Sequence, residues 1–213
     1  MLVSEVFNAV GADTRGQAVS PTIGTAEWNQ WLSWANEELR SHGEVHDWIE
    51  NTHPHHVVSL GQSGTSLAMP DNFKKMSGSL SLNGVFYTEV DSDQFDKYDS
   101  TNNVFRVGYN GGWYLEVKPP STSGATGYAP HIGYHTSLAT ATDRIVMRNP
   151  YYLVKRLKSR IFKYRQDPIF TEIESEADIM LQQMLENEYY KHSQYRGGAT
   201  TTEEETGFVL GQD

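Results

Sequence analysis

The sequence predicts an α+β fold: a helical bundle, made of an N-terminal helix and a C-terminal α-hairpin, with an inserted antiparallel β domain. Asn149-Pro150 and Asp167-Pro168 each pair a polar N-cap with a proline suited to the first helical turn. Between these helices and the N-terminal ones, the spacing of apolar residues changes from a period of 3.6 to a period of 2. The expected parts are helical residues 1–54, a β domain over 55–140, the α-hairpin over 141–195 and a flexible tail over 196–213.

Composition limits the possible functions. The chain has 213 residues, a formal net charge of −10 and no cysteine. The length suits one sizeable domain, and the negative charge argues against a protein that binds nucleic acid through phosphates. Without cysteine there is no disulfide, thiolate zinc site or cysteine nucleophile. The sequence has no apolar run typical of a signal peptide or a membrane span, so we expect no membrane contact.

Helices are expected on both sides of a polar loop near the N-terminus. A short helix around residues 2–10 is followed by a loop over 14–25, which is rich in Gly, Ser and Thr, and a second helix begins near Thr25. Gly43 is expected to end this helix in the left-handed conformation. Its apolar face predicts packing in the core, the alternative being an exposed aromatic platform, and comprises Trp28, Trp31, Leu32, Ala35 and Leu39, with Trp34 at the margin.

Two hairpins are expected in the β domain. Asn83-Gly84 lies between alternating apolar residues and fits a two-residue type I′ turn, and Asn110-Gly111-Gly112 connects a second pair of strands. A short capped helix is expected over residues 91–98. The last strand is expected to run through Ile132 and Tyr134.

The α-hairpin has an apolar stripe on each helix, at helical spacing. The stripes are Val154, Leu157, Ile161 and Tyr164 on the first helix, and Phe170, Ile173, Ala177, Met180, Leu181, Met184 and Leu185 on the second. The first helix is basic and the second acidic, which predicts either pairing within the hairpin or weak contacts between subunits of a ring that fix their register. The candidate residues for inter-subunit or channel charge are Lys155, Arg156, Lys158, Arg160, Lys163 and Arg165.

No catalytic or metal-binding motif matches. His42 and His46 are four residues apart, but their order differs from His-Glu-x-x-His. His53, His55 and His56 cluster in the sequence, and His131 and His135 would share one strand face, so a site assembled across the fold is the alternative. The acidic run over residues 91–99 lacks the glycine and glutamate of a calcium loop. We expect no catalytic residue, no metal and no cofactor.

Several short segments follow one another in an order that resembles a known family. Leu67-Ala-Met-Pro-Asp-Asn-Phe73 is similar to the Leu-Pro-x-Asp-Phe entry into the β region of the head-to-tail adaptor, or head completion, proteins of tailed bacteriophages, including the tail tubular protein A type. Met69 stands where that family commonly has leucine. The resemblance covers about residues 25–195 and continues through Leu115-Glu-Val-Lys-Pro-Pro120, Tyr134, Thr142-Asp143, Pro150 and Asp167.

The resemblance implies a non-enzymatic virion protein of the head–tail connector, assembled in the host cytoplasm. It would form a ring, usually of twelve copies, between the portal protein and the tail or nozzle proteins, through which DNA passes during ejection without sequence recognition. A negative chain suits that passage because it does not hold phosphates. The alternative is a β-rich sugar- or protein-binding module of a tail fibre or surface protein, with Trp113, Tyr114 and Tyr134 as stacking platforms.

The tail ends in a short apolar segment. After Gly197-Gly198 come threonines and glutamates, and then Phe208, Val209 and Leu210 between two glycines. An extended apolar triplet suits β-augmentation, in which a segment adds to the edge of a partner's sheet. Because the adaptors that the chain resembles often anchor a C-terminal segment in the portal, these three residues are the candidate portal-binding site. The alternative is a tail with no binding role.

Overall fold

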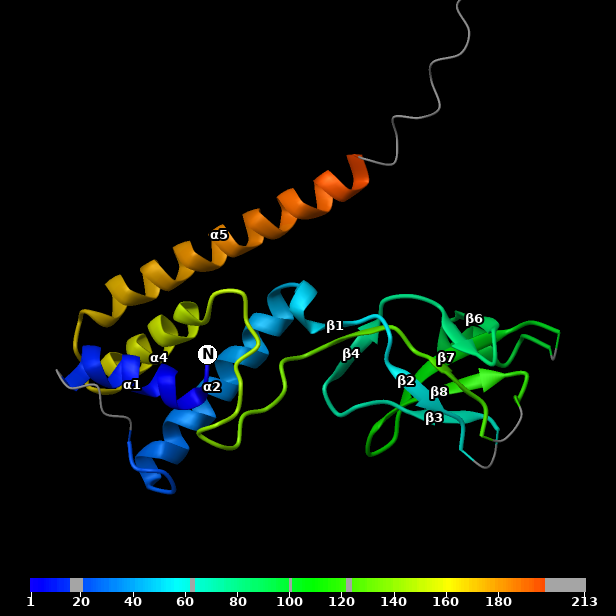
Figure 1. Cartoon of the computed structure of the whole chain (residues 1–213), viewed down its shortest axis with the longest axis horizontal. Helices are drawn as coiled ribbons and strands as arrows, with labels where there is room; N and C mark the ends of the chain where they lie inside the picture. Colours follow the sequence, from blue (N-terminus) through cyan, green and yellow to red (C-terminus); the bar gives the residue numbers. More distant parts are fainter. Residues whose placement is uncertain (16–20, 62–63, 100, 122–123, 198–213) are drawn as a thin grey trace, which may run out of the picture. The chain divides into compact units, whose positions relative to one another are not determined.

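A computed structural model of the chain describes residues 1–15, 21–61, 64–99, 101–121 and 124–197, and it has a mixed α+β fold (Figure 1). The described residues group into two compact units. Unit 1 comprises Met1–Val3 and Ile23–Met147, and unit 2 comprises Ser4–Thr22 and Arg148–Asp213. Apart from Met1–Val3, unit 1 therefore lies, in the sequence, between the two segments of unit 2.

In unit 1, a long helix precedes the β strands. Helix α2 (Ala26–Val45) begins at the N-cap Thr25, whose side-chain oxygen accepts a hydrogen bond from the Trp28 amide. Trp28 and Trp31 are buried as the stripe predicts, whereas Leu32 and Trp34 are half-buried. A 3-10 turn, η1 (Ile49–Asn51), leads from this helix into the first strand.

The predicted stop at Gly43 is wrong. Helix α2 continues through this residue to Val45, and the extended residue His46 is its C-cap. A Cβ atom on Gly43 would lie 3.1 Å from Cδ1 of Tyr134. The glycine therefore allows another side chain to approach the helix closely, instead of ending the helix.

The strands of unit 1 form two sheets. A small sheet has the order β1-β10-β4, from β1 (Thr52–His53), β10 (His131–Gly133) and β4 (Phe73–Met76). The larger, seven-stranded sheet has the order β2-β9-β5-β6-β7-β8-β3. Its strands are β2 (Val57–Ser59), β3 (Ser66–Ala68), β5 (Leu80–Leu82), β6 (Val85–Glu89), β7 (Val104–Tyr109), β8 (Trp113–Lys118) and β9 (Thr126–Tyr128).

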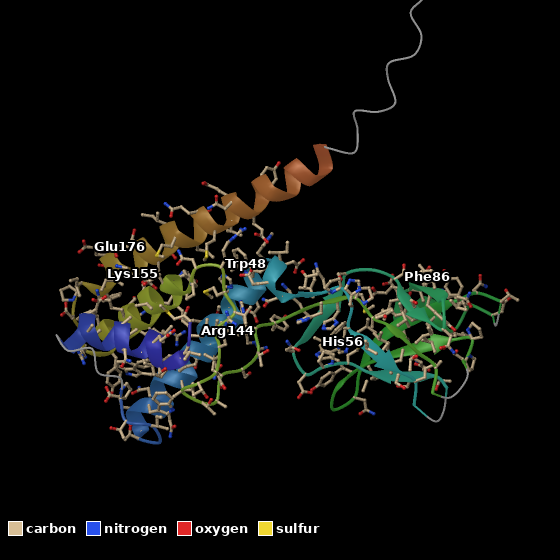
Figure 2. All side chains as sticks on the ribbon, in the orientation of Figure 1. Trp48, His56, Phe86, Arg144, Lys155 and Glu176 are labelled. Carbon is tan, nitrogen blue, oxygen red and sulfur yellow. The ribbon has the colours of Figure 1, made fainter. Side chains whose placement is uncertain are left out.

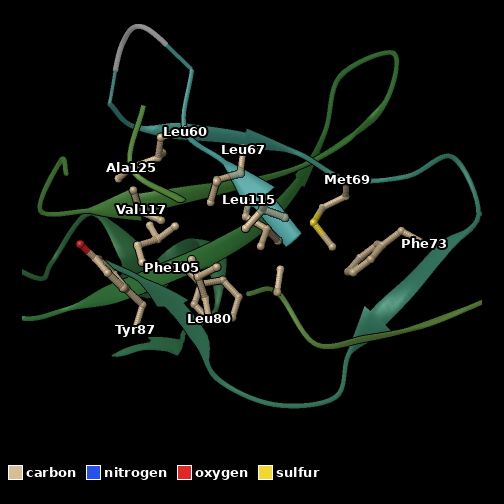
Figure 3. Packing of buried hydrophobic residues seen from close by; sticks show 13 residues of the cluster. Leu60, Leu67, Met69, Phe73, Leu80, Tyr87, Phe105, Leu115, Val117 and Ala125 are labelled. Carbon is tan, nitrogen blue, oxygen red and sulfur yellow. The ribbon is translucent and has the colours of Figure 1, made fainter. Parts of the chain in front are cut away.

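The larger sheet is nearly closed. Its edge strands β2 and β3 follow each other in the chain, and the Gly61 amide donates a hydrogen bond of 3.2 Å to the Ser66 carbonyl beside them. One hydrophobic core fills the inside of this sheet (Figure 3). It comprises Val58, Leu60, Leu67, Met69, Phe73, Leu80, Leu82, Tyr87, Phe105, Leu115, Val117, Ala125 and Ala129.

Both predicted hairpins are present. Asn83 and Gly84 have positive φ angles of 48° and 80° between the paired residues Leu82 and Val85, as a type I′ turn requires. Strands β7 and β8 pair from Val104 to Tyr109 around the predicted turn at 110–112. The last strand ends at Gly133, so the prediction that it includes Tyr134 is wrong.

The β domain is not purely antiparallel. Strands β6 and β7 run parallel, with Thr88 opposite Val104 and Glu89 opposite Phe105. The short helix α3 (Ser92–Phe95) and the residues after it form the connection between these strands. Parallel neighbours need such a crossover, because the chain must return to the end of the sheet at which it started.

The described residues of unit 2 form three helices: α1 (Val3–Arg15, from its second residue on), α4 (Pro150–Tyr164) and α5 (Phe170–Gly197). Asn149 caps α4 through a hydrogen bond of 3.2 Å that its side-chain oxygen accepts from the Tyr151 amide. The Asp167 side chain accepts one of 3.1 Å from the Ile169 amide, but α5 begins only at Phe170, so Pro168 lies in the turn before the helix.

The apolar stripes of α4 and α5 are buried or half-buried, with one exception. Val154, Leu157 and Ile161 on α4 are buried, as are Ile173, Ala177 and Met184 on α5, whereas Phe170, Met180, Leu181 and Leu185 are half-buried. Tyr164 was expected in the first stripe but is 72% exposed. It is the last residue of α4, where the chain already turns toward α5.

Candidate functional site

The basic residues of α4 face carboxylates of their own chain. Lys155 Nζ lies 2.6 Å from a carboxylate oxygen of Glu176 on α5, and Figure 2 shows the two side chains together. The Arg156 guanidinium contacts Asp178 at 2.5 Å and Glu174 at 3.8 Å. The structure therefore contains the pairing within the hairpin that is one of the two interpretations of the segregated charge.

The remaining candidate cations also make contacts inside unit 2. Lys158 Nζ lies 3.1 Å from Asp13 of α1, and the Arg165 guanidinium donates a hydrogen bond of 3.1 Å to the Thr14 carbonyl. Lys163 Nζ lies 5.6 Å from the centre of the Phe170 ring. Arg160 is half-buried on the same helix. A role for these six residues between subunits stays a prediction.

An ion pair between the half-buried Arg148, just before α4, and a buried carboxylate joins this segment to α5. The Arg148 guanidinium lies 2.5 Å from a carboxylate oxygen of Glu188, whose side chain is 2% exposed. This contact is one that sequence reasoning missed, because Glu188 looks like one more solvated carboxylate of an acidic helix.

The histidines form two groups in unit 1, and neither follows the order of the sequence. His42 on α2 pairs with His135, and we call these two the histidine pair. His131 contacts His53 and His56, with 4.8 Å between its ring centre and each of theirs. His131 and His135 do not share a strand face, because β10 ends between them at Gly133.

The histidine pair is held by hydrogen bonds at both ends. Nδ1 of His42 lies 2.9 Å from Nε2 of His135, and His135 also bonds to the backbone of Val146. The His42 ring stacks on the Trp48 ring, with 4.2 Å between the ring centres and 5° between the planes. The Trp48 indole donates a hydrogen bond of 2.7 Å to the His42 carbonyl. The position of each imidazole is thus fixed by other groups.

The surroundings of the histidine pair favour neutral imidazoles. Burial, together with the charges of His135 and His46, lowers the pKa of His42 to about 3. Burial also lowers the pKa of His135 to about 4, against a hydrogen bond to Val146 that raises it. Two neutral rings can share one hydrogen bond, because each then has one donor and one acceptor nitrogen.

The second histidine group lies beside the nearly closed sheet. Nδ1 of His131 is 3.1 Å from the Ala129 carbonyl oxygen, and burial lowers the pKa of His131 and of His56. Within the described ranges, no group of three or more His, Cys, Asp or Glu side chains is placed to hold a metal ion. The expectation that no metal is bound stays a prediction.

The acidic run after β6 is used locally. One carboxylate oxygen of Asp99 accepts hydrogen bonds of 2.8 Å from the Thr101 amide, 2.5 Å from its hydroxyl and 2.9 Å from the Asn102 side chain. These bonds lower the pKa of Asp99 and close a turn. Asp91 is the N-cap residue of α3.

The three aromatic residues proposed as stacking platforms lie in different surroundings. The Tyr114 ring covers Gly108, and the Tyr134 ring lies against Gly43 and 5.7 Å below Lys74 Nζ. Trp113 is half-buried between Phe73 and Tyr109, with ring centres 5.6 and 5.1 Å away. Tyr109, which sequence reasoning did not single out, is the exposed member of this group.

A row of side chains with three exposed apolar members crosses the larger sheet. Val57 pairs with Tyr128, Tyr128 with Ser81, and Ser81 with Phe86, so all four residues lie on one face. Val57, Tyr128 and Phe86 are exposed, and Phe86 is labelled in Figure 2. Contiguous exposed apolar side chains are typical of surfaces that contact other molecules.

Phe208, Val209 and Leu210 lie outside the described residues. Among the helices that the structure describes, none combines the length and the apolar character needed to cross a bilayer. Comparison with known proteins finds no protein-family model that matches the chain and no curated relative.

Proposed function

We propose that this chain is a non-enzymatic structural protein of a tailed-bacteriophage virion that forms an adaptor ring between portal and tail. Its partners are the portal protein, the tail or nozzle proteins and further copies of itself, and viral DNA passes through the ring without sequence recognition. The ring belongs to the neck of the virion and is assembled in the host cytoplasm.

The observation that carries the proposal is the position of the resembling segments in the fold. Leu67-Ala-Met-Pro-Asp-Asn-Phe73 runs from β3 into β4, and Leu115-Glu-Val-Lys-Pro-Pro120 ends β8. Tyr134 directly follows β10. The Asp143 carboxylate accepts hydrogen bonds from the Ala139 and Thr140 amides, Pro150 opens α4 and Asp167 precedes α5. The segments thus coincide with element boundaries, which supports a shared architecture.

The composition of unit 2 supports the finer arrangement that we propose, a helical bundle into which the β domain is inserted. Helix α1 belongs to the same unit as α4 and α5, and Lys158 of α4 contacts Asp13 of α1. All strands that the structure describes belong to the intervening residues of unit 1. In this proposal, residues 198–213, which follow α5, contact the portal.

The charge distribution is compatible with a channel through which DNA slides. The chain has a net charge of −10, and Lys155, Arg156 and Lys158 contact carboxylates of the same chain. Cations already paired in this way offer little attraction to phosphates, whereas retention of DNA needs clustered, available positive charge.

The test is electron microscopy of the full chain with the portal protein encoded in the same genome. The expected result is a ring with rotational symmetry, usually twelve-fold in the family that the chain resembles, docked on one face of the portal. Each protein imaged alone is the control. A chain that stays monomeric and sediments separately from the portal contradicts the proposal.

The alternative proposal is a binding module of a tail fibre or surface protein. The feature that favours it is the exposed Tyr109 ring, packed edge-on against Trp113 with 5.1 Å between ring centres. Glycan binding by the isolated monomer that is lost on Tyr109→Ala would support this module and argue against the ring.

A further inference from the structure

Three segments of unit 1 meet at the histidine pair. They are the last turns of α2, the residues around the start of β4, and residues 134–147, which we call the strap. The strap leaves β10 and contains no helix or named strand of its own. It is therefore held by individual side-chain and backbone contacts instead of a regular hydrogen-bond ladder.

Two asparagines hold the strap through bonds that do not depend on pH. Asn36 of α2 donates a hydrogen bond of 2.9 Å to the Leu138 carbonyl and accepts one of 2.7 Å from the Leu138 amide. Asn72, just before β4, donates one of 2.9 Å to the Tyr134 carbonyl, and its own carbonyl accepts one of 2.6 Å from the Tyr134 amide. His135 lies between these two positions in the chain. Its contact with His42 differs from the asparagine bonds, because both imidazole rings can take up a proton.

We propose that the histidine pair is a proton-operated latch, which holds the strap on α2 while both imidazoles are neutral and releases it when both are protonated. The hydrogen bond between Nδ1 of His42 and Nε2 of His135 needs one donor and one acceptor. Two imidazolium rings have only donors and carry like charges, so protons taken from solvent remove this contact.

Charged side chains of β4 and of the segment after α2 contact each other near the histidine pair. From β4, Lys74 Nζ donates hydrogen bonds to the Gly43 carbonyl at 2.6 Å and the His46 carbonyl at 3.5 Å. The Asp47 carboxylate is engaged by Lys74 at 2.9 Å and by Lys75. The other titratable groups on the last turns of α2 are Glu38, one turn before His42, the paired Arg40 and Glu44, and His46 at the C-cap. The strap carries Tyr134, Asp143 and Arg144, and Asp71 lies just before β4.

Release is therefore coupled to pH in one direction. A histidine freed from these contacts titrates near its ordinary pKa of about 6.5, whereas the closed pair resists protonation because it is buried. Below about pH 6.5 the open strap binds protons that the closed strap does not bind. With two protons taken up, the open-to-closed ratio rises up to about 100-fold per pH unit between about pH 5.5 and 4.5, and is constant above about pH 7.

Amide hydrogen exchange of the full chain tests the latch. Exchange of the Leu138 and Tyr134 amides, each divided by its intrinsic rate, is measured from about pH 7 to 4.5. The expected result is a rise below about pH 6 that approaches two protons in its steepness. The amides of Leu115 and Val107 in the β7–β8 pairing serve as the reference for global unfolding. Their normalised exchange rates should rise less than those of the strap amides.

Matched variants test whether the pH dependence of exchange comes from the histidine pair or from other histidines. His42→Gln with His135→Gln can keep a hydrogen bond but cannot take up protons, so the pH dependence of the strap amides should disappear. His55→Gln is the control, because His55 is exposed beside Tyr128 and lies outside the pair. Retention of the pH dependence in the double variant overturns the latch.

Wild-type protein alone also decides the matter, should the double variant not fold. A normalised exchange rate of Leu138 that is the same at about pH 7 and 4.5 overturns the latch, as does a rise that the reference amides share in full. The Trp48 indole proton is a second reporter, because it is bonded to the His42 carbonyl at 2.7 Å. If only the strap opens, the Trp48 indole proton should stay protected from exchange at low pH.

Discussion

Single residues in this protein are often fixed by atoms far away in the sequence. A Cβ atom on Gly127 in β9 would overlap the carbonyl oxygen of Ser81 on the neighbouring strand β5. A Cβ atom on Gly43 of α2 would lie 3.1 Å from the Tyr134 side chain, a tight but milder contact. Neither glycine has a positive φ angle, so close approach explains both.

Gly127→Ala should destabilise unit 1 strongly. The obstacle is backbone of a paired strand, which cannot rotate away, so we expect a loss of about 3 kcal/mol in the free energy of unfolding. The matched control is Gly112→Ala, because a Cβ atom there meets no atom within 4 Å. Urea unfolding followed by tryptophan fluorescence measures both variants. Equal midpoints for the two would show that β9 shifts freely.

Sequence reasoning grouped the histidines by their spacing along the chain, and the grouping is wrong for His42 with His46 and for His131 with His135. The structure pairs His42 with His135, which are 93 residues apart, and brings His131 to His53 and His56. A histidine on the buried face of a helix was the available signal at His42. Its partner could not be found from sequence, because a contact across the fold leaves no local pattern.

The elements that were predicted correctly are those marked by short local motifs, in which the interacting residues are only a few positions apart in the sequence. Asn149 and Asp167 bond to amides of the turns that follow them, and Asn83-Gly84 makes the expected turn. The parallel pairing of β6 with β7 was missed, because local alternation predicts a strand but not its neighbour or direction. The segregated charge of α4 and α5 was noticed, but sequence could not assign its partners.

The packing of α4 should control the stability of unit 2. Leu157 and Ile161 are 0% and 4% exposed, so each replacement by alanine should cost about 2–5 kcal/mol. Ile179→Ala is the matched control, since Ile179 on α5 is 56% exposed and the same atoms are removed. Chemical denaturation followed by helical circular dichroism measures the change. Similar losses for Ile161→Ala and Ile179→Ala would show that the buried stripe is misassigned.

The buried pair of Arg148 and Glu188 should behave differently from the exposed pairs of the same helices. Arg148→Ala leaves the 2% exposed Glu188 side chain without this guanidinium and should cost about 3–5 kcal/mol. Replacing both residues, with Arg148→Met and Glu188→Leu, should restore most of the loss, because no buried charge remains. Lys155→Ala, at a pair that is largely exposed, should change stability little.

A double-mutant cycle on Arg148 and Glu188 gives the coupling between them. We expect the sum of the two single losses in the free energy of unfolding to exceed the loss measured for the double variant. Strict additivity would show that the ion pair contributes nothing of its own and that the single losses come from packing.

At the scale of the whole molecule, the chain separates into a mixed unit with all described strands and a unit of three helices. The sequence predicts the two classes of structure because hydrophobic period is a local property. It places all N-terminal helical residues with the α-hairpin, whereas α1 groups with α4 and α5 and α2 groups with the strands in unit 1. Sequence could not separate these two helices, since their grouping depends on contacts between residues such as Asp13 and Lys158, 145 positions apart.

The last prediction concerns residues 198–213, which follow the described part of α5 and include Phe208, Val209 and Leu210. Because the buried hydrophobic residues that the structure describes lie between Val3 and Met184, deleting this segment should leave the melting temperature nearly unchanged. In the ring proposal the same deletion should abolish assembly on the portal, since an extended apolar triplet is suited to adding to a sheet edge. Full-length chain with Phe208→Ser and Leu210→Ser is the matched control for length and should also fail to assemble. Normal rings on portal from the truncated chain, seen by electron microscopy, would show that the tail is not the portal-binding segment.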